Sequence, residues 1–133
     1  MPIRVLLVDD HVAVLERVKQ FLSSEFTVVA TASNGPEMLA AFAQHNPDVI
    51  VTDITMHGMN GIEASRRVLQ SRPGTPIVIF SVHREPGVVQ NALEAGVRAY
   101  VHKLSGEDLV PAVHCAMEGR RFVSESCKYP ATH

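Results

Sequence analysis

The sequence feature that most constrains the fold is a regular alternation of short apolar runs with longer amphipathic runs. The short runs are rich in β-branched residues and almost continuously apolar, which is typical of parallel strands buried on both faces. The longer runs repeat their apolar residues at helical spacing. The predicted strands are 3–8, 27–32, 48–52, 76–81 and 98–102, and the predicted helices are 12–24, 36–45, 62–71, 86–95 and 107–117.

Five strand–helix units in alternation predict a doubly wound α/β fold, in which helices cover both faces of a parallel sheet. The simplest arrangement is a flavodoxin-like sheet of five strands in the order 2-1-3-4-5 with five helices, although alternation alone leaves a Rossmann-like order open. The 133 residues suffice for one compact core and are too few for two ordinary domains. We therefore expect one domain over 1–118, followed by a polar tail or the start of a linker over 119–133.

Composition and charge exclude several classes of function. The 12 basic and 14 acidic residues give a net charge of −2, without the basic excess that nucleic-acid binding requires. The two cysteines are too few for a disulfide scaffold, so Cys115 is interpreted as a packed helix residue and Cys127 as a free thiol in the tail. The sequence has neither a signal-peptide pattern nor an apolar run near the ~20 residues of a membrane span. We expect a cytoplasmic chain that contacts neither DNA nor membrane.

Acidic residues follow two of the predicted strands. Asp9 and Asp10 end the first strand and Asp53 ends the third, and in the order 2-1-3-4-5 these strands flank the point where ligands bind. Carboxylates so close repel one another unless a cation lies among them, and oxygen ligands suit Mg²⁺ or Mn²⁺. Each residue alone has a simpler explanation, because Asp10 would also suit a helix cap and an Asp after a strand is commonly a turn residue.

Two further polar residues follow the fourth and fifth strands. Ser81 and Lys103 would bring a hydroxyl and an ammonium group to the same edge of the sheet as the acids. Individually they are ordinary, a satisfied hydroxyl and a solvated charge. Together with the acids they supply a nucleophile, a metal site and donors for phosphoryl oxygens, which is the set that phosphoryl transfer needs.

Four segments carry a resemblance to a known family, namely 5–11, 53–61, 81–83 and 99–103. In order and separation they resemble the receiver domain of bacterial two-component response regulators over about residues 3–118. The Asp-Asp-His opening, the Ser-Val-His segment and the ending at 118–122 are similar to the NarL/FixJ (LuxR-type) subfamily in particular.

The resemblance implies a role for each acid. Asp53 would be the phosphoacceptor, receiving its phosphoryl group from the phosphohistidine of a sensor histidine kinase or from a small phosphodonor. Asp10, Asp53 and the backbone carbonyl of Thr55 would hold Mg²⁺ directly, and Asp9 would act through a bound water. The chain would then be a signalling domain that catalyses only its own phosphorylation and dephosphorylation, and not an enzyme.

The resemblance also implies a switch. Lys103 would neutralise phosphoryl charge, and Ser81 would donate its hydroxyl to a phosphoryl oxygen. Ser81 would move toward the phosphoryl group and the Tyr100 ring would turn inward behind it, remodelling the face formed by helix 86–95, strand 98–102 and helix 107–117. Phosphorylation can only bias two states that are already close in energy.

Several positions depart from the family pattern or vary within it. His57 replaces a common Pro, which predicts a less rigid loop after Asp53. Leu104 follows Lys103 where the family usually has a cis Pro, and since a cis bond before Leu costs ~3 kcal/mol, cis or trans stays open. Thr55 and His83 are expected to set the lifetime of the phosphorylated state. Three histidines, His11, His57 and His83, are interpreted as decoration of the rim rather than as metal ligands.

The resemblance extends to partners that lie outside this sequence. Members of the subfamily carry a helix-turn-helix DNA-binding domain after a linker, so transcriptional control is expected of a longer protein and no DNA contact of these residues. The sequence does not distinguish a fragment from a stand-alone regulator. A homodimer is open, either through helices 12–24 and 107–117 or around helix 86–95.

Three alternative functions fit the sequence less well. An aspartyl phosphohydrolase usually needs a second acid two residues after its nucleophile, where this chain has Thr55. A nucleotide- or flavin-binding module would need a phosphate-cradling glycine loop, and neither glycine motif is present. A degenerate receiver that signals by protein–protein contact alone would not need the complete set of chemical positions seen here.

Overall fold

The computed structural model describes residues 2–128, in which strands and helices alternate along the chain. The strands are β1 (Arg4–Val8), β2 (Thr27–Ala32), β3 (Val49–Thr52), β4 (Ile77–Ser81), β5 (Ala99–His102) and β6 (Phe122–Val123). The helices are α1 (Val12–Leu22), α2 (Gly35–His45), α3 (Gly61–Ser71), α4 (Pro86–Glu94) and α5 (Leu109–Met117), with short 3-10 turns at Gly106–Asp108 and Glu125–Cys127. Among these residues no helix is both long enough and apolar enough to cross a bilayer.

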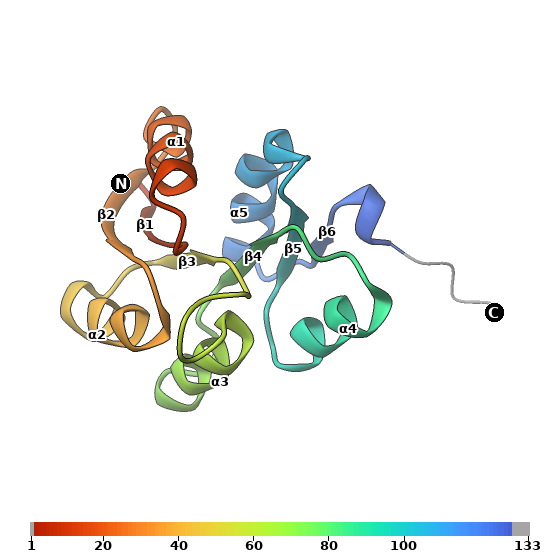
Figure 1. The fold of residues 1–133 in the computed structure, drawn as a ribbon. Helices are drawn as coiled ribbons and strands as arrows, with labels where there is room; N and C mark the ends of the chain where they lie inside the picture. The colour runs from red at the N-terminus through yellow and green to blue at the C-terminus, as the bar shows by residue number, and fades with distance from the viewer. Residues whose placement is uncertain (1, 129–133) are drawn as a thin grey trace.

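The sheet is parallel throughout and has the order β2-β1-β3-β4-β5-β6. The predicted order 2-1-3-4-5 is therefore confirmed and the Rossmann-like order is excluded. β1 lies between β2 and β3, so the chain reverses its direction of winding between β1 and β3 (Figure 1). This reversal brings the ends of β1 and β3 side by side.

The two faces of the sheet are covered by different helices (Figure 1). α1 and α5 pack on one face against Val5, Leu7 and their equivalents on the other strands. α2, α3 and α4 pack on the opposite face against Leu6, Val8 and their equivalents. Successive residues of each central strand thus point into two separate apolar layers, which explains why these strands are apolar without alternation.

The start of the last helix differs from its prediction. The helical pattern predicted a start at residue 107, whereas Gly106–Asp108 forms a 3-10 turn and α5 begins at Leu109. Pro111 explains the shift, because it has no N–H to donate to the carbonyl of residue 107 and its ring would clash with that carbonyl. A proline fits only in the first turn of a helix, where donors have no helical partner.

The segment after Gly119 is folded against the domain, and its described part is not the polar tail that was predicted. Phe122 and Val123 pair with Ala99 and Tyr100 as a sixth strand, β6. Cys127 is a free cysteine, as predicted, but it is only 1% exposed and packs in the layer that also holds Tyr100 instead of lying in a tail. The remainder of the predicted tail, 129–133, lies outside the described residues.

Candidate functional site

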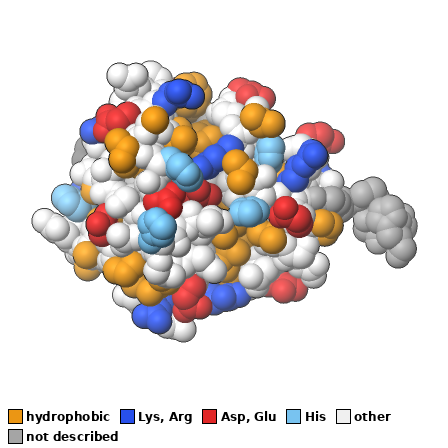
Figure 2. All heavy atoms as spheres, in the orientation of Figure 1, with side chains coloured by type: hydrophobic (Ala, Val, Ile, Leu, Met, Phe, Trp, Pro, Cys, Tyr) orange, Lys and Arg blue, Asp and Glu red, His pale blue; other side chains and the backbone are white. Residues whose placement is uncertain are grey.

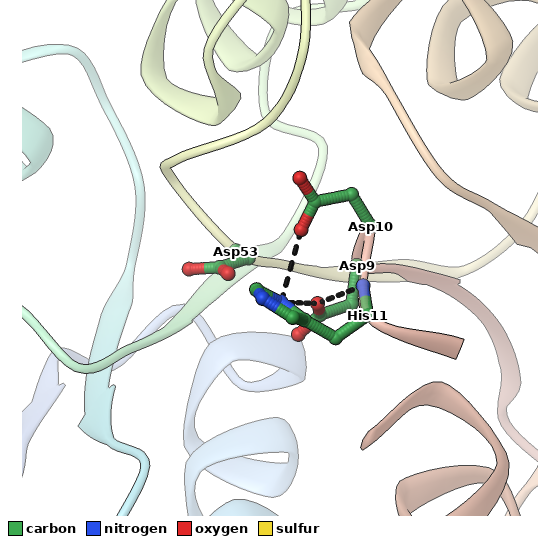
Figure 3. A group of neighbouring side chains, drawn as sticks. All are labelled: Asp9, Asp10, His11 and Asp53. Atoms are coloured by element: carbon green, nitrogen blue, oxygen red, sulfur yellow. Dashed lines mark hydrogen bonds and ion pairs between the residues drawn. The ribbon is translucent and has the colours of Figure 1, made fainter. Parts of the chain in front are cut away.

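Three carboxylates meet where β1 and β3 end. Asp9 and Asp10 follow β1 directly, and Asp53 follows β3, whose position beside β1 is fixed by a hydrogen bond from Asp53 N–H to the Val8 carbonyl at 3.0 Å. Ligand atoms of these acids and of His11 all lie within 4.8 Å of one another (Figure 3). The convergence predicted from strand order is therefore present.

Gly61 allows α3 to approach this site. A Cβ at residue 61 would lie 1.8 Å from the Asp53 carbonyl oxygen and 3.2 Å from the Ile54 Cα, so only glycine fits here. The Gly61 N–H donates to the Ile54 carbonyl at 2.8 Å and holds the loop closed. The start of α3 thus supports the backbone that carries Asp53.

Lys103 reaches two of the acids from the end of β5. Its Nζ donates to Asp9 Oδ2 at 2.7 Å and to Asp53 Oδ2 at 2.9 Å. Burial alone lowers the pKa of Lys103, but the hydrogen bonds to Asp9 and Asp53 outweigh it, and the pKa lies above its ordinary value. The ammonium therefore stays charged beside two carboxylates whose side chains are only 4% and 6% exposed.

Asp10 provides the test of whether these residues fit a divalent cation. Its Oδ1 is buried and accepts no hydrogen bond, although the His11 Nδ1 lies 3.0 Å away in a poorly directed ion pair. The helix cap is His11, so the alternative that Asp10 caps α1 is wrong. A buried carboxylate oxygen without a donor, next to two further carboxylates, is the donor set that a hard divalent cation prefers.

His11 was expected on the rim, and its ring is indeed exposed, but it also contacts the acids. The His11 backbone N–H donates to Asp9 Oδ1 at 2.9 Å, and the ring Nδ1 lies 3.2 Å from the same oxygen. Figure 3 shows the ring beside the Asp9 carboxylate, with ion pairs to both Asp9 and Asp10. The contact could have been predicted from the position of His11 directly after Asp10 in the sequence. The spacing rules for tetrahedral metal sites, which were used to interpret the histidines, do not detect such a contact.

Ser81, Thr55 and His83 line the neighbouring loops. Ser81 is fully buried at the end of β4, and its Oγ accepts from the His83 N–H at 3.0 Å. Thr55 Oγ1 and His83 Nε2 lie 2.8 Å apart, and His83 Nδ1 is 3.5 Å from Glu85 Oε2. The two positions expected to act on the phosphorylated state thus contact each other directly, which sequence alone did not reveal.

Tyr100 lies inward in this structure. The side chain is fully buried, and its hydroxyl donates to the His83 carbonyl at 2.7 Å. Burial raises the pKa of the Tyr100 phenol above its ordinary value, so the hydroxyl remains a donor. The inward position that was expected of a phosphorylated state is already occupied.

The peptide bond between Lys103 and Leu104 could be cis or trans from the sequence alone. Residues 2–128 contain no cis peptide bond, so Lys103–Leu104 is trans. The Leu104 side chain is 87% exposed. Figure 2 shows acidic, basic and histidine side chains next to one another near the middle of the molecular surface.

The sequence matches the response regulator receiver domain family over residues 5–114. The chain belongs to this family. It is a receiver domain of two-component signal transduction, with an acidic pocket of the kind in which such domains hold a metal ion.

The receiver is similar to transcriptional response regulators. It is 37% identical over 128 residues to the nitrate/nitrite response regulator protein NarL of Escherichia coli K12, covering 94% of this chain and 59% of NarL. It is 32% identical to the transcriptional regulatory protein DegU of Brevibacillus brevis, covering 91% of this chain and 52% of DegU. The receiver thus spans about half the length of the curated relatives it matches.

A solved structure of a related protein has the same fold. A LuxR-family two-component response regulator from Aurantimonas sp. SI85-9A1 superposes with a TM-score of 0.91 at 33% identity, covering 96% of this chain and 93% of that one. The predicted subfamily is confirmed by these relatives.

Proposed function

We propose that this receiver accepts a phosphoryl group on Asp53 from the phosphohistidine of a sensor histidine kinase. One Asp53 oxygen forms a bond to phosphorus as the bond from phosphorus to the histidine nitrogen breaks. The released imidazole keeps the electron pair of that bond and takes up a proton. The observation that carries the proposal is the buried Asp53 carboxylate held 2.9 Å from Lys103 Nζ and beside Asp9 and Asp10.

The residues around Asp53 would hold the cation and the transferred group. Asp10, Asp53 and the Thr55 carbonyl would bind Mg²⁺ or Mn²⁺ directly, and Asp9 would bind it through water. The cation supplies charge neutralisation for the phosphoryl oxygens. Lys103 offers a second positive charge, and Ser81, at the end of β4, would offer its hydroxyl once it moves toward the phosphoryl group.

The switch would act by changing the relative populations of two arrangements of the loop after β4. Tyr100 already holds the His83 carbonyl in its inward position, so phosphorylation would stabilise this arrangement rather than create it. The face that would respond consists of α4, β5 and α5. The direct contact between Thr55 and His83 supports their proposed role in setting the lifetime of the phosphorylated state.

The proposed partners follow from the family. The receiver would act in the cytoplasm, where a sensor histidine kinase would supply the phosphoryl group, and a homodimer would form through α1 with α5 or around α4. The similarity to NarL and DegU supports transcriptional control by a longer protein through a helix-turn-helix domain, with no DNA contact by this receiver. A stand-alone receiver acting through protein contacts is the alternative.

Intact-mass measurement after treatment with acetyl phosphate and Mg²⁺ tests the proposal. The receiver should gain the mass of one phosphoryl group, Asp53→Ala should gain none, and Asp48→Ala, an acid at the opposite edge of the sheet, should gain one. Rapid turnover of acetyl phosphate without a stable adduct would instead support a phosphohydrolase. In the same preparation, Mg²⁺ should raise the melting temperature, because a ligand that binds only the folded state adds about 1–3 kcal/mol once its concentration is well above Kd.

A further inference from the structure

Two side chains on one face of β5 hold the loop that follows β4. Tyr100 and His102 are two residues apart in a strand, so they point to the same face. Tyr100 donates to the His83 carbonyl at 2.7 Å, and His102 Nε2 lies 3.2 Å from the Val82 carbonyl. These carbonyls are consecutive in the segment that joins Ser81 to α4. The loop is therefore fixed at two adjacent points.

The hydrogen bonds of His102 define its tautomer. The Leu104 N–H donates to His102 Nδ1 at 3.3 Å, and since a backbone N–H can only donate, Nδ1 carries no proton. The ring proton must then lie on Nε2, which faces the Val82 carbonyl and donates to it. A neutral imidazole thus connects the loop after Ser81 with the turn after Lys103.

The backbone fixes the position of this imidazole. His102 pairs with Ser81 in the register of β4 and β5, and the Lys103 N–H donates to the Ser81 carbonyl at 2.9 Å. On its other side the His102 N–H donates to Ser124 Oγ at 3.2 Å, and the Ser124 hydroxyl donates to Asp108 at 2.8 Å. His102 is only 8% exposed, so water competes little for its bonds.

We propose that His102 is a positioning residue for phosphoryl transfer, which fixes the separation between the loop that follows Ser81 and the turn that follows Lys103. Its hydrogen bonds go to Val82, Leu104 and Ser124 and not to Asp53. It acts by holding the hydroxyl and the ammonium group in reach of the same acceptor, and it shares this task with Tyr100. The inference rests on the proposed phosphorylation of Asp53.

The test compares three variants of the receiver. His102→Leu removes both ring bonds and keeps an apolar side chain. His102→Gln retains a donor that can reach the Val82 carbonyl. His45→Leu makes the same change as the first variant at the end of α2, where the strands begin. For each, we would measure the rate of phosphorylation by acetyl phosphate and the amide hydrogen exchange of Leu104, and in the unaltered receiver the ¹⁵N resonances of the His102 ring.

The Leu variant should be phosphorylated about five- to tenfold more slowly, as expected for the loss of a buried neutral hydrogen bond, with faster exchange at Leu104. The Gln variant should recover most of the rate, and the control should match the unaltered receiver. A Leu variant with an unchanged rate, or a ring protonated on Nδ1, would overturn the inference. If the Leu variant does not fold, the Gln variant and the ring spectra still decide. If the unaltered receiver gains no phosphoryl group, the proposed function fails, whereas the spectra and the Leu104 exchange still report on the bridge itself.

Discussion

At the amino edge of the sheet, where the strands begin, charged side chains are used to satisfy the backbone. The Arg4 guanidinium donates to the carbonyls of His45 and Asn46, and Arg72 donates to that of Pro47. Asp48 accepts from the Arg4 N–H at 2.9 Å. At the carboxyl edge, by contrast, three acids lie together but only Asp9 and Asp53 accept from Lys103, and an Asp10 oxygen is buried without a donor. At the amino edge the charged groups are paired with backbone groups of the protein, whereas at the carboxyl edge a carboxylate oxygen remains available to a ligand.

The largest expected difference between the edges concerns two glycines. Gly61→Ala places a methyl group 1.8 Å from the Asp53 carbonyl and should lower the free energy of unfolding by about 3 kcal/mol or more, because backbone must move. Gly74→Ala at the amino edge meets only an Arg98 nitrogen at 3.8 Å, and its positive φ should cost about 1 kcal/mol. Urea denaturation measures both. Equal losses would show that the carboxyl edge is no more tightly packed than the amino edge.

The next prediction replaces one acid at each edge by alanine. The free energy of unfolding should change in opposite directions at the two edges. Without divalent cations, Asp10→Ala should raise the free energy of unfolding by about 0.5–1 kcal/mol, since it relieves repulsion and an unpaired oxygen. Asp48→Ala should lower it by about 1 kcal/mol, since the Arg4 N–H loses its acceptor. Melting temperatures with and without Mg²⁺ measure the effect, and the Mg²⁺-dependent rise should persist in the second variant and vanish in the first. A destabilised Asp10 variant would mean that the acid is already satisfied without a cation.

The smallest effect concerns an acid at the carboxyl edge that, unlike Asp10, accepts hydrogen bonds from neighbouring groups. Glu37, in the first turn of α2, accepts from the Ser33 N–H and hydroxyl, each at 2.9 Å. The backbone hydrogen bond from Ser33 is the main reason that the pKa of Glu37 lies below its ordinary value of 4.5. Its contribution to stability is therefore present above the unfolded value and is lost as pH falls through the folded value. Glu37→Gln should make the decline of melting temperature on acidification slightly shallower, and superimposable profiles would contradict the assignment.

Much of this comparison could be predicted from sequence, because it depends on where strands end. The apolar runs of the sequence located β1 and β3, and the simplest strand order for five strand–helix units made them neighbours. The sequence was therefore enough to predict that Asp9, Asp10 and Asp53 lie close together. Lys103 could be assigned to the same edge for the same reason. Its hydrogen bonds to two particular acids depend on side-chain conformation and could not.

The unpredicted features depend on tertiary contacts that leave little local pattern. β6 has two residues, Phe122 and Val123, too few for a period to be recognised. Cys127 is buried because the chain folds back over β5, although its neighbours in sequence are polar. The two ring hydrogen bonds of His102 depend on the positions of both the Val82 carbonyl and the Leu104 N–H, which lie in different loops. The same two-residue periodicity that places Tyr100 inward would have indicated that His102 points the same way.

The sixth strand has a consequence for how copies of this protein can meet. The outermost strand of an open sheet offers its free N–H and C=O groups to any extended chain, and proteins shorten or cover such strands to prevent aggregation. β6 covers part of β5 and is itself only two residues long, so this side of the sheet presents little template for another strand. Self-association on this side would therefore have to use helices rather than strand pairing.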